Sequence, residues 1–343
     1  MRLASTSRTA RTLAAAISVA LLLAACGGDD APTTAPMTPD VEPVLRIVAT
    51  VSPLADLVAQ VGGERVEVRP LVPAGADAHT YAPRPGDARR IERADLYVGI
   101  GLGLNDDALR LARTNLGTDA QLVLLGEEYL DTTGFVFDHG VGERTDLPVA
   151  ASGLGPNPHV WTSLTNARAL VVGIVTVLAE ADPEGAEEYA RRGAMLDAAL
   201  ADLFARVDVA VATIAVEDRV LVTYHDAWVY FARDHGLDHA IAVQAGDLSD
   251  PSATGVRALI DQVRELGVRA VFGSRVFPSA VLEVIAAESG ATYVPGLSDD
   301  VLPGEPGDAE HHYLELMRQN ALIIVEGLGG DASALATPIA RLG

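Results

Sequence analysis

The chain has 343 residues, 49% of them hydrophobic, and its length predicts two lobes rather than one small core. Its 25 basic residues, all arginine, stand against 47 acidic ones, and a net charge of −22 argues against nucleic-acid binding. The lack of lysine excludes Schiff-base and P-loop chemistry, and a single cysteine excludes an internal disulfide or a multi-cysteine metal site.

The first segment, residues 1–25, has the layout of a bacterial lipoprotein signal. Arginines precede an uncharged apolar run that is too short to span a bilayer. The run ends in LAACG, so the one cysteine, Cys26, lies where signal cleavage and lipid attachment require it. Residues 26–43, rich in Pro, Thr and Asp, predict a flexible tether. We expect an extracytoplasmic protein anchored to the bacterial membrane by lipid at Cys26; the alternative is an ordinary signal followed by a chance cysteine.

From residue 45 onward, short apolar runs alternate with helical periodicity, a pattern typical of βα units with buried parallel sheets. An N-terminal lobe, residues 44–181, is predicted to contain strands at 45–51, 66–72, 95–100 and 121–125. A C-terminal lobe, residues 217–343, is predicted to contain strands at 220–224, 240–243, 270–272 and 292–294. The predicted class is α/β, with two (β/α)4-like lobes whose sheets are mostly parallel.

Residues 182–216 predict a long helix that links the two lobes. Pro183 suits a first helical position, and apolar residues then recur at spacings of three, four and seven. They are Tyr189, Leu196, Leu200, Leu203, Val207, Val211 and Ile214. A single helix of about 31 residues would extend about 46 Å. The alternative is two ordinary helices with a break near Gly193.

Three of the eight histidines lie where strands or turns end. His79 and His225 follow predicted strands, and His159 lies in a rigid turn before a predicted helix. Asp299 and Asp300 follow the last predicted strand. Because ligands of open α/β sheets bind beyond the carboxyl ends of the strands, these side chains are candidates for a site of three imidazoles and one carboxylate. Their spacing alone does not force the four loops to converge.

Several stretches carry distinctive motifs. They are PAGADAHTYAPRP (73–85), ADL (94–96), GLGLN (101–105), NPHVW (157–161), YHDAWVYFARDHGL (224–237), and the SDD, PGD and MRQN of residues 297–328. These motifs resemble, in order and over nearly the whole mature chain, the zinc/manganese ABC-transporter substrate-binding lipoproteins called cluster A-I. The resemblance implies two lobes joined by one long bridging helix, with a metal site in the cleft between the lobes.

The resemblance also implies the metal ligands. They carry over to His79, His159, His225 and an aspartate of the SDD loop. Asp299 fits the family's Ser-Asp pair, and Asp300 stays open because this loop is one residue shorter before the following Gly-Asp. Three imidazoles and one carboxylate favour four-coordinate Zn²⁺ as the transported ligand, whereas members with Glu in place of His225 suit Mn²⁺. Mn²⁺, iron or broad divalent binding is the alternative.

The implied function is capture of the metal by a monomer that is not an enzyme and that delivers the ion to an ABC permease and its ATPase. A zinc hydrolase is an alternative, but the sequence has no H-E-x-x-H and a fourth ligand would close the site. A lipoprotein of the cell-adhesion type with a structural metal differs only in its partner.

Two further expectations concern the remaining histidines. Many zinc-binding members carry a His-rich loop where residues 126–156 here are acidic and hold only His139. We interpret this loop as a weak zinc-collecting element or as a solvated acidic loop. His311 and His312 are expected to be exposed and to have no part in the metal site.

Overall fold

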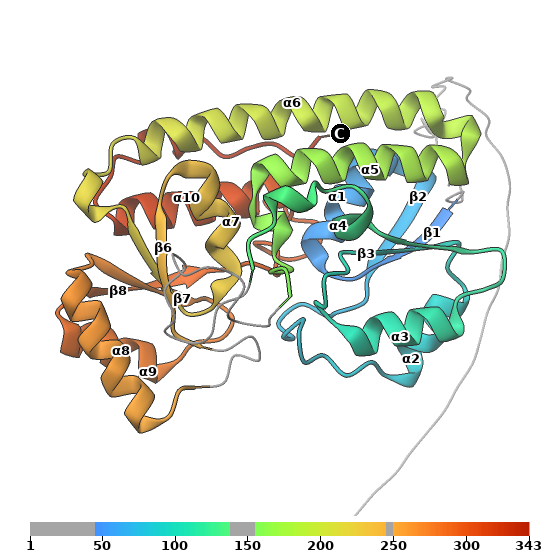
Figure 1. Cartoon of the computed structure of the whole chain (residues 1–343). Coiled ribbons are helices and arrows are strands. Elements are labelled where there is room, and N and C mark those ends of the chain that lie inside the picture. Colours follow the sequence, from blue (N-terminus) through green and yellow to red (C-terminus); the bar gives the residue numbers. More distant parts are fainter. Residues whose placement is uncertain (1–44, 138–154, 245–249, 343) are drawn as a thin grey trace, which may run out of the picture. The chain divides into compact units, whose positions relative to one another are not determined.

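The computed structural model describes residues 45–137, 155–244 and 250–342, all within one compact unit of residues 41–343. The predicted signal, the tether with Cys26, and His139 lie outside the described residues. Two four-stranded sheets form the framework, one in each half of the chain (Figure 1). All the strand pairings within them are parallel.

The N-terminal sheet has the strand order β2-β1-β3-β4. Its strands are β1 (Leu45–Ala49), β2 (Val66–Pro70), β3 (Leu96–Gly99) and β4 (Gln121–Leu124). The helices of this half are α1 (Ser52–Gly62), α2 (Pro85–Glu92), α3 (Asp106–Asn115), α4 (Leu125–Glu128) and α5 (Leu164–Ala181). All residues of β3 are buried, as expected of an inner strand covered on both faces.

The C-terminal sheet repeats this topology, with the order β6-β5-β7-β8. Its strands are β5 (Val220–Thr223), β6 (Asp238–Ala242), β7 (Ala270–Ser274) and β8 (Thr292–Leu297). The helices of this half are α7 (Val229–His235), α8 (Ala253–Leu266), α9 (Ala280–Ser289) and α10 (Tyr313–Gly327). Every residue of β7 is buried. In each half the first strand of the sequence lies between the second and the third, so both sheets present the carboxyl ends of their strands in equivalent ways.

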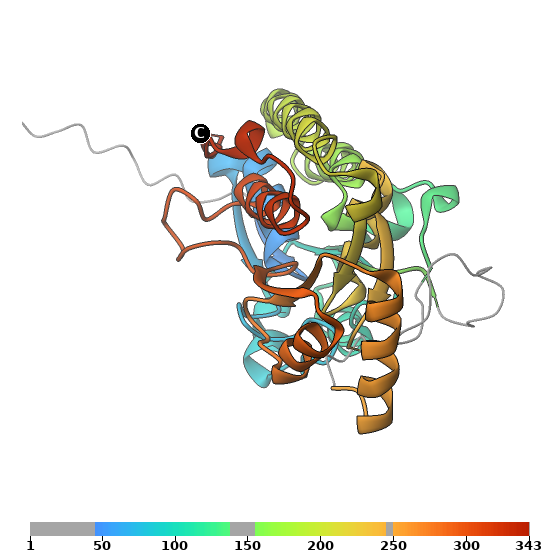
Figure 2. The same cartoon turned by 90° about the vertical axis from the view of Figure 1, so that its left-hand side faces the viewer.

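One long helix, α6 (Ala186–Val211), contacts α1 and α5 of the first half and α7 and α10 of the second (Figure 1). Figure 2 shows it nearly along its axis, beside α5. All the apolar positions expected to face inward between Tyr189 and Ile214 are buried. The helix runs through Gly193 without a break, and a Cβ at that position would lie 2.4 Å from Val175 Cγ2. Gly193 therefore permits close packing of α5 against α6.

The observed helix is shorter than the predicted one, with 26 residues and a length of about 39 Å. Residues Pro183–Gly185 form a 3₁₀ turn instead of its first turn. The carboxylate of Asp182 accepts hydrogen bonds from Arg65 Nε (2.7 Å) and from the Tyr189 hydroxyl (2.6 Å). These contacts fix the chain just before the helix, and they explain why α6 starts at Ala186.

Short 3₁₀ turns connect several of these elements. They are η1 (Gly63–Arg65), η2 (Thr132–Gly134), η4 (Val160–Thr162), η6 (Val216–Asp218), η7 (Asp226–Trp228) and η8 (Ser333–Leu335). Among the described helices, α5 is long and apolar enough to cross a membrane, but it packs against α1 and α6 in the core. The structure thus confirms the predicted α/β class with two parallel-sheet lobes and one long helix.

Candidate metal centre

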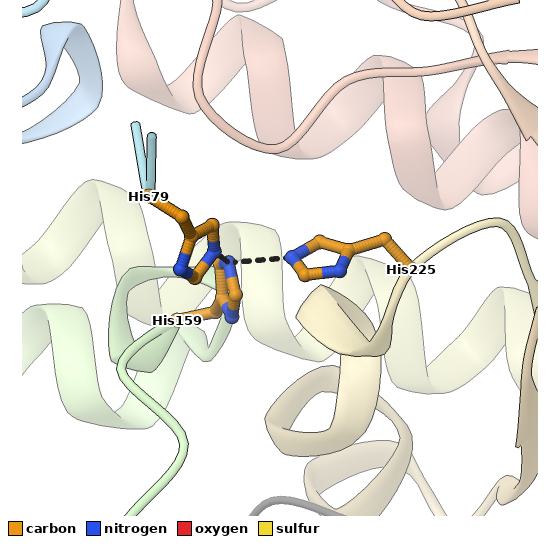
Figure 3. Close-up of side chains that lie close together, drawn as sticks. All are labelled: His79, His159 and His225. Carbon is orange, nitrogen blue, oxygen red and sulfur yellow. Dashed lines mark hydrogen bonds between the residues drawn. The ribbon is translucent and has the colours of Figure 1, made fainter. Parts of the chain in front are cut away.

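Three histidine side chains converge in the structure (Figure 3). His79 lies in the loop between β2 and α2, His159 directly precedes η4, and His225 follows β5. The Nε2 atoms of His79 and His225 each lie 3.0 Å from Nε2 of His159. Nitrogens bound to one tetrahedral zinc ion at 2.0–2.1 Å are about 3.3 Å apart. These two separations are close to those between zinc ligands, and the ligand nitrogens of all three histidines lie within 4.8 Å of one another.

The backbone and neighbouring polar groups orient the two buried rings. Nδ1 of His159 lies 3.0 Å from Oδ1 of Asn157, which also accepts a hydrogen bond from the His159 backbone N–H. Nδ1 of His225 lies 3.2 Å from Oδ1 of Asp226. With the proton on Nδ1, which the contact with Asn157 favours, the ring of His159 presents the lone pair of Nε2 to the cluster, as a metal requires.

The third histidine, His79, is less buried and is held through its loop. Asp77 Oδ1 accepts a hydrogen bond from the His79 backbone N–H (2.8 Å), and its Oδ2 accepts one from the Thr80 hydroxyl (2.6 Å). Asn105 donates its side-chain N–H to the carbonyl of Ala78 (2.5 Å). Asp77 thus stabilises the loop that carries His79.

Two adjacent aspartates lie at the edge of the imidazole cluster, in the loop after β8. Oδ2 of Asp299 is 3.9 Å from Nε2 of His159, and its Oδ1 accepts a hydrogen bond from the Tyr224 hydroxyl. The backbone carbonyl of Asp300 accepts a hydrogen bond from Ser52 Oγ (2.7 Å). Its side-chain Oδ1 is buried and has no hydrogen-bond partner among the described residues. Both aspartates remain candidates for a fourth ligand.

Burial controls the charge of the site when it holds no ion. Desolvation by burial is the main cause that lowers the pKa of His159 well below its ordinary value, and the charges of the neighbouring His225 and His79 lower it further. Desolvation by burial is also the main cause that raises the pKa of Asp300 well above its ordinary value, and the negative charges of Asp299 and Asp77 raise it further. The imidazole of His159 is therefore neutral near pH 7, and a bound cation would offset the repulsion between the carboxylates.

The space between these residues is very small. The cavity lined by the three histidines and the two aspartates has a volume of about 10 Å³, which suits one water-sized sphere. Trp161 closes one wall: its ring lies 5.2 Å from that of His159, and its Nε1 donates to the carbonyl of Asp299 (2.6 Å). A cavity of this size accepts a single ion and has no room for an organic substrate.

Comparison with known proteins shows the family to which this chain belongs. The profile of the family described as "Zinc-uptake complex component A periplasmic" (ZnuA) matches residues 47–327. The chain belongs to the ZnuA family. It is therefore an extracytoplasmic metal-binding protein of the ABC substrate-binding type, and its family consists of transport proteins rather than enzymes.

Relatives of this ZnuA-family chain differ in the metal for which they are named. The manganese-binding lipoprotein MntA of Halalkalibacterium halodurans is 28% identical over 90% of this chain and 95% of its own length. The zinc uptake protein ZnuA of Paracoccus denitrificans is also 28% identical, over 84% of this chain and 93% of its own length. The iron-binding protein YfeA of Yersinia pestis is 27% identical over 83% of this chain and 86% of its own length.

Solved structures agree with the fold. The Mn-bound periplasmic metal-binding protein of Candidatus Liberibacter asiaticus superposes with a TM-score of 0.68 at 25% identity, covering 83% of this chain and 99% of its own. The periplasmic zinc-binding protein TroA of Treponema pallidum superposes with a TM-score of 0.71 at 24% identity, over the same shares of the two chains. The expected α/β fold of the ZnuA family is thus confirmed.

Sequence reasoning missed some of the residues that build the site, and it misplaced one histidine. Tyr224 orients Asp299, and Asn157 orients His159. Each of these two residues lies within two positions of a predicted ligand, which is the signal that could have identified them. His312 was expected to be exposed but is fully buried, where it caps α10 and its Nε2 lies 3.0 Å from the Ile339 carbonyl. That contact comes from the C-terminal segment, which local sequence patterns do not reveal.

Proposed function

We propose that this protein binds Zn²⁺ through His79, His159, His225 and Asp299 and delivers the ion to an ABC permease and its ATPase. The observation that carries the proposal is the convergence of three imidazole nitrogens within 4.8 Å of one another. The carboxylate of Asp299 beside His159 supplies an oxygen at the edge of this set. The protein acts as a monomer that holds the ion and then releases it.

The donor set supports zinc as the preferred ion. Zn²⁺ accepts four ligands and favours imidazole nitrogen, whereas Mn²⁺ favours carboxylate, carbonyl and water oxygens in larger shells. At a given set of nitrogen and oxygen ligands, the intrinsic affinity for Zn²⁺ also exceeds that for Mn²⁺. Relatives named for manganese, zinc and iron do not decide between these ions.

A competition experiment tests the choice of metal. The metal-free protein is dialysed against equal concentrations of Zn²⁺ and Mn²⁺, and the bound metals are measured by mass spectrometry. We expect about one zinc ion per chain and at least tenfold less manganese, in keeping with the order of intrinsic affinities. The matched variant, His225→Glu, exchanges one imidazole for a carboxylate and should shift the ratio towards manganese. A wild-type protein that retains mainly manganese would refute the zinc assignment.

The organisation of the chain is part of the same proposal. We propose that residues 44–181 and 217–343 are two lobes and that residues 182–216 link them. We also propose that Cys26, which lies outside the described residues, carries a lipid anchor, because it ends a signal-like segment and relatives are named as lipoproteins.

Replacing Cys26 with serine tests the lipid anchor. The variant should leave the membrane fraction, because acyl chains on the cysteine would provide its attachment. Its zinc affinity should not change, since Cys26 is not among the proposed ligands. The measurement is the division of the protein between membrane and soluble fractions in its host. A variant that stays with the membranes would show that attachment does not depend on Cys26.

A further inference from the structure

The hydroxyl of Tyr224 is buried beside the metal site and donates a hydrogen bond to Oδ1 of Asp299. Its backbone is fixed between neighbouring strands. The Tyr224 N–H donates to the carbonyl of Phe272 (2.9 Å), and its own carbonyl accepts from the N–H of Gln244 (2.7 Å). The tyrosine therefore holds the carboxylate from a rigid position at the end of β5.

Asp299 is also held in place through its backbone. The carbonyl of Asp299 accepts a hydrogen bond from Trp161 Nε1, and the next carbonyl, that of Asp300, accepts one from Ser52 Oγ. Trp161 and Ser52 belong to the first half of the chain, whereas the aspartates belong to the second. With Oδ1 bound to Tyr224, Oδ2 is the oxygen that lies towards the imidazoles, at 3.9 Å from His159 Nε2.

We propose that Tyr224 is a positioning residue that limits Asp299 to one metal bond and thereby favours Zn²⁺ over Mn²⁺. This inference rests on the proposed function. A carboxylate can bind a metal through one oxygen or through both, and an oxygen that accepts a hydrogen bond from a fixed phenol has one lone pair fewer to offer the ion and is held away from it. One oxygen and three nitrogens complete a four-coordinate zinc shell, whereas a chelating carboxylate would raise the coordination number and add the oxygen that Mn²⁺ favours.

The phenol is the donor in its hydrogen bond with Asp299. Desolvation by burial is the main cause that raises the pKa of Tyr224 well above its ordinary value in the metal-free protein, and the charge of Asp299 and the hydrogen bond to it raise it further.

The experiment compares Tyr224→Phe with a matched control, Tyr189→Phe. Both tyrosines are fully buried and donate a hydrogen bond to an aspartate, but Tyr189 contacts Asp182 at the start of α6. Zinc and manganese affinities are measured by competition titration. We expect Tyr224→Phe to lower the preference for zinc over manganese about 10–100-fold, the range typical of lost partners of metal ligands. Tyr189→Phe should leave the preference unchanged.

Substitution of Co²⁺ for zinc gives a direct reading of coordination. Four-coordinate cobalt absorbs visible light more strongly than cobalt with larger shells, because geometry governs these transitions. The wild-type protein should give the strong four-coordinate spectrum, and Tyr224→Phe should give a weaker one. A weak wild-type spectrum would overturn the inference even if the variant failed to fold.

A double-substitution cycle shows whether Tyr224 acts through Asp299. In an Asp299→Ala background, Tyr224→Phe should have no further effect on the ratio of zinc to manganese affinity. If the wild-type protein binds zinc, and Tyr224→Phe has the same preference for zinc over manganese and the same cobalt spectrum, this inference is overturned while the proposed function stands. An effect that persists without Asp299 would also overturn it. A wild-type protein that binds no zinc would instead overturn the proposed function, and the inference with it.

Discussion

Replacing His159 with alanine is expected to lower the zinc affinity by more than 100-fold. His159 is central to the cluster, because its Nε2 is 3.0 Å from Nε2 of both other histidines and 3.9 Å from Oδ2 of Asp299. Its loss removes a ligand, so the effect should exceed the 10–100-fold expected when only a partner of a ligand is lost. The measurement is a competition titration against a chromophoric zinc chelator.

A matched control for this substitution is His311→Ala. His311 is partly buried, and its Nδ1 lies 3.1 Å from the carbonyl of Pro303. The control loses an imidazole and one contact but no candidate ligand, so its zinc titration should match that of the wild type. Circular dichroism of both variants would verify that they fold. A His159→Ala protein that titrates normally would show that zinc is bound elsewhere.

Acidification is expected to weaken zinc binding steeply. Each imidazole must be neutral to bind the ion, so protons compete with zinc as the pH falls towards the ordinary histidine pKa of about 6.5. Burial lowers the pKa of His159, so this ring should be protonated only at lower pH. We expect at least a tenfold loss of affinity between about pH 7.5 and pH 5.5. Isothermal titration across this range, in buffers of different ionisation enthalpy, would measure affinity and proton release together.

The same lowered pKa affects the metal-free protein. Below about pH 6.5 the unfolded chain protonates His159 while the folded chain does not, so the free energy of unfolding falls as the pH drops. Thermal unfolding with and without zinc would show both effects, because bound metal adds its own stabilisation at neutral pH.

A zinc affinity that stays flat as the solution is acidified would mean that histidines are not the main ligands.

Much of the fold follows from hydrophobic pattern alone. Buried parallel strands read as short continuous apolar runs, so each predicted strand lies within a few residues of an observed one. The prediction at residues 45–51 is too long because Thr50 and Val51 already lead into α1. The predicted long helix begins too early, because Arg65 and Tyr189 hold Asp182 just before the observed start. These contacts form only in the folded chain.

The candidate site was less accessible to sequence reasoning. Strand-end positions single out His79 and His225, but their convergence with His159 depends on how the two halves pack, which local spacing does not specify. The resemblance to a known family supplied that step. The sequence does not separate Asp299 from Asp300, because both neighbours line the same small cavity. The burial of His312 rests on a contact with the distant Ile339 and left no local signal.

X-ray absorption at the zinc edge, on protein loaded with one equivalent of Zn²⁺, tests the central claim most directly. It measures the number and type of atoms around the ion, independently of affinity. The account predicts three imidazole nitrogens and one oxygen at about 2.0–2.1 Å. A shell of five or six oxygens, or one with fewer than two imidazoles, would contradict the assignment of His79, His159 and His225 as the ligands of the transported zinc.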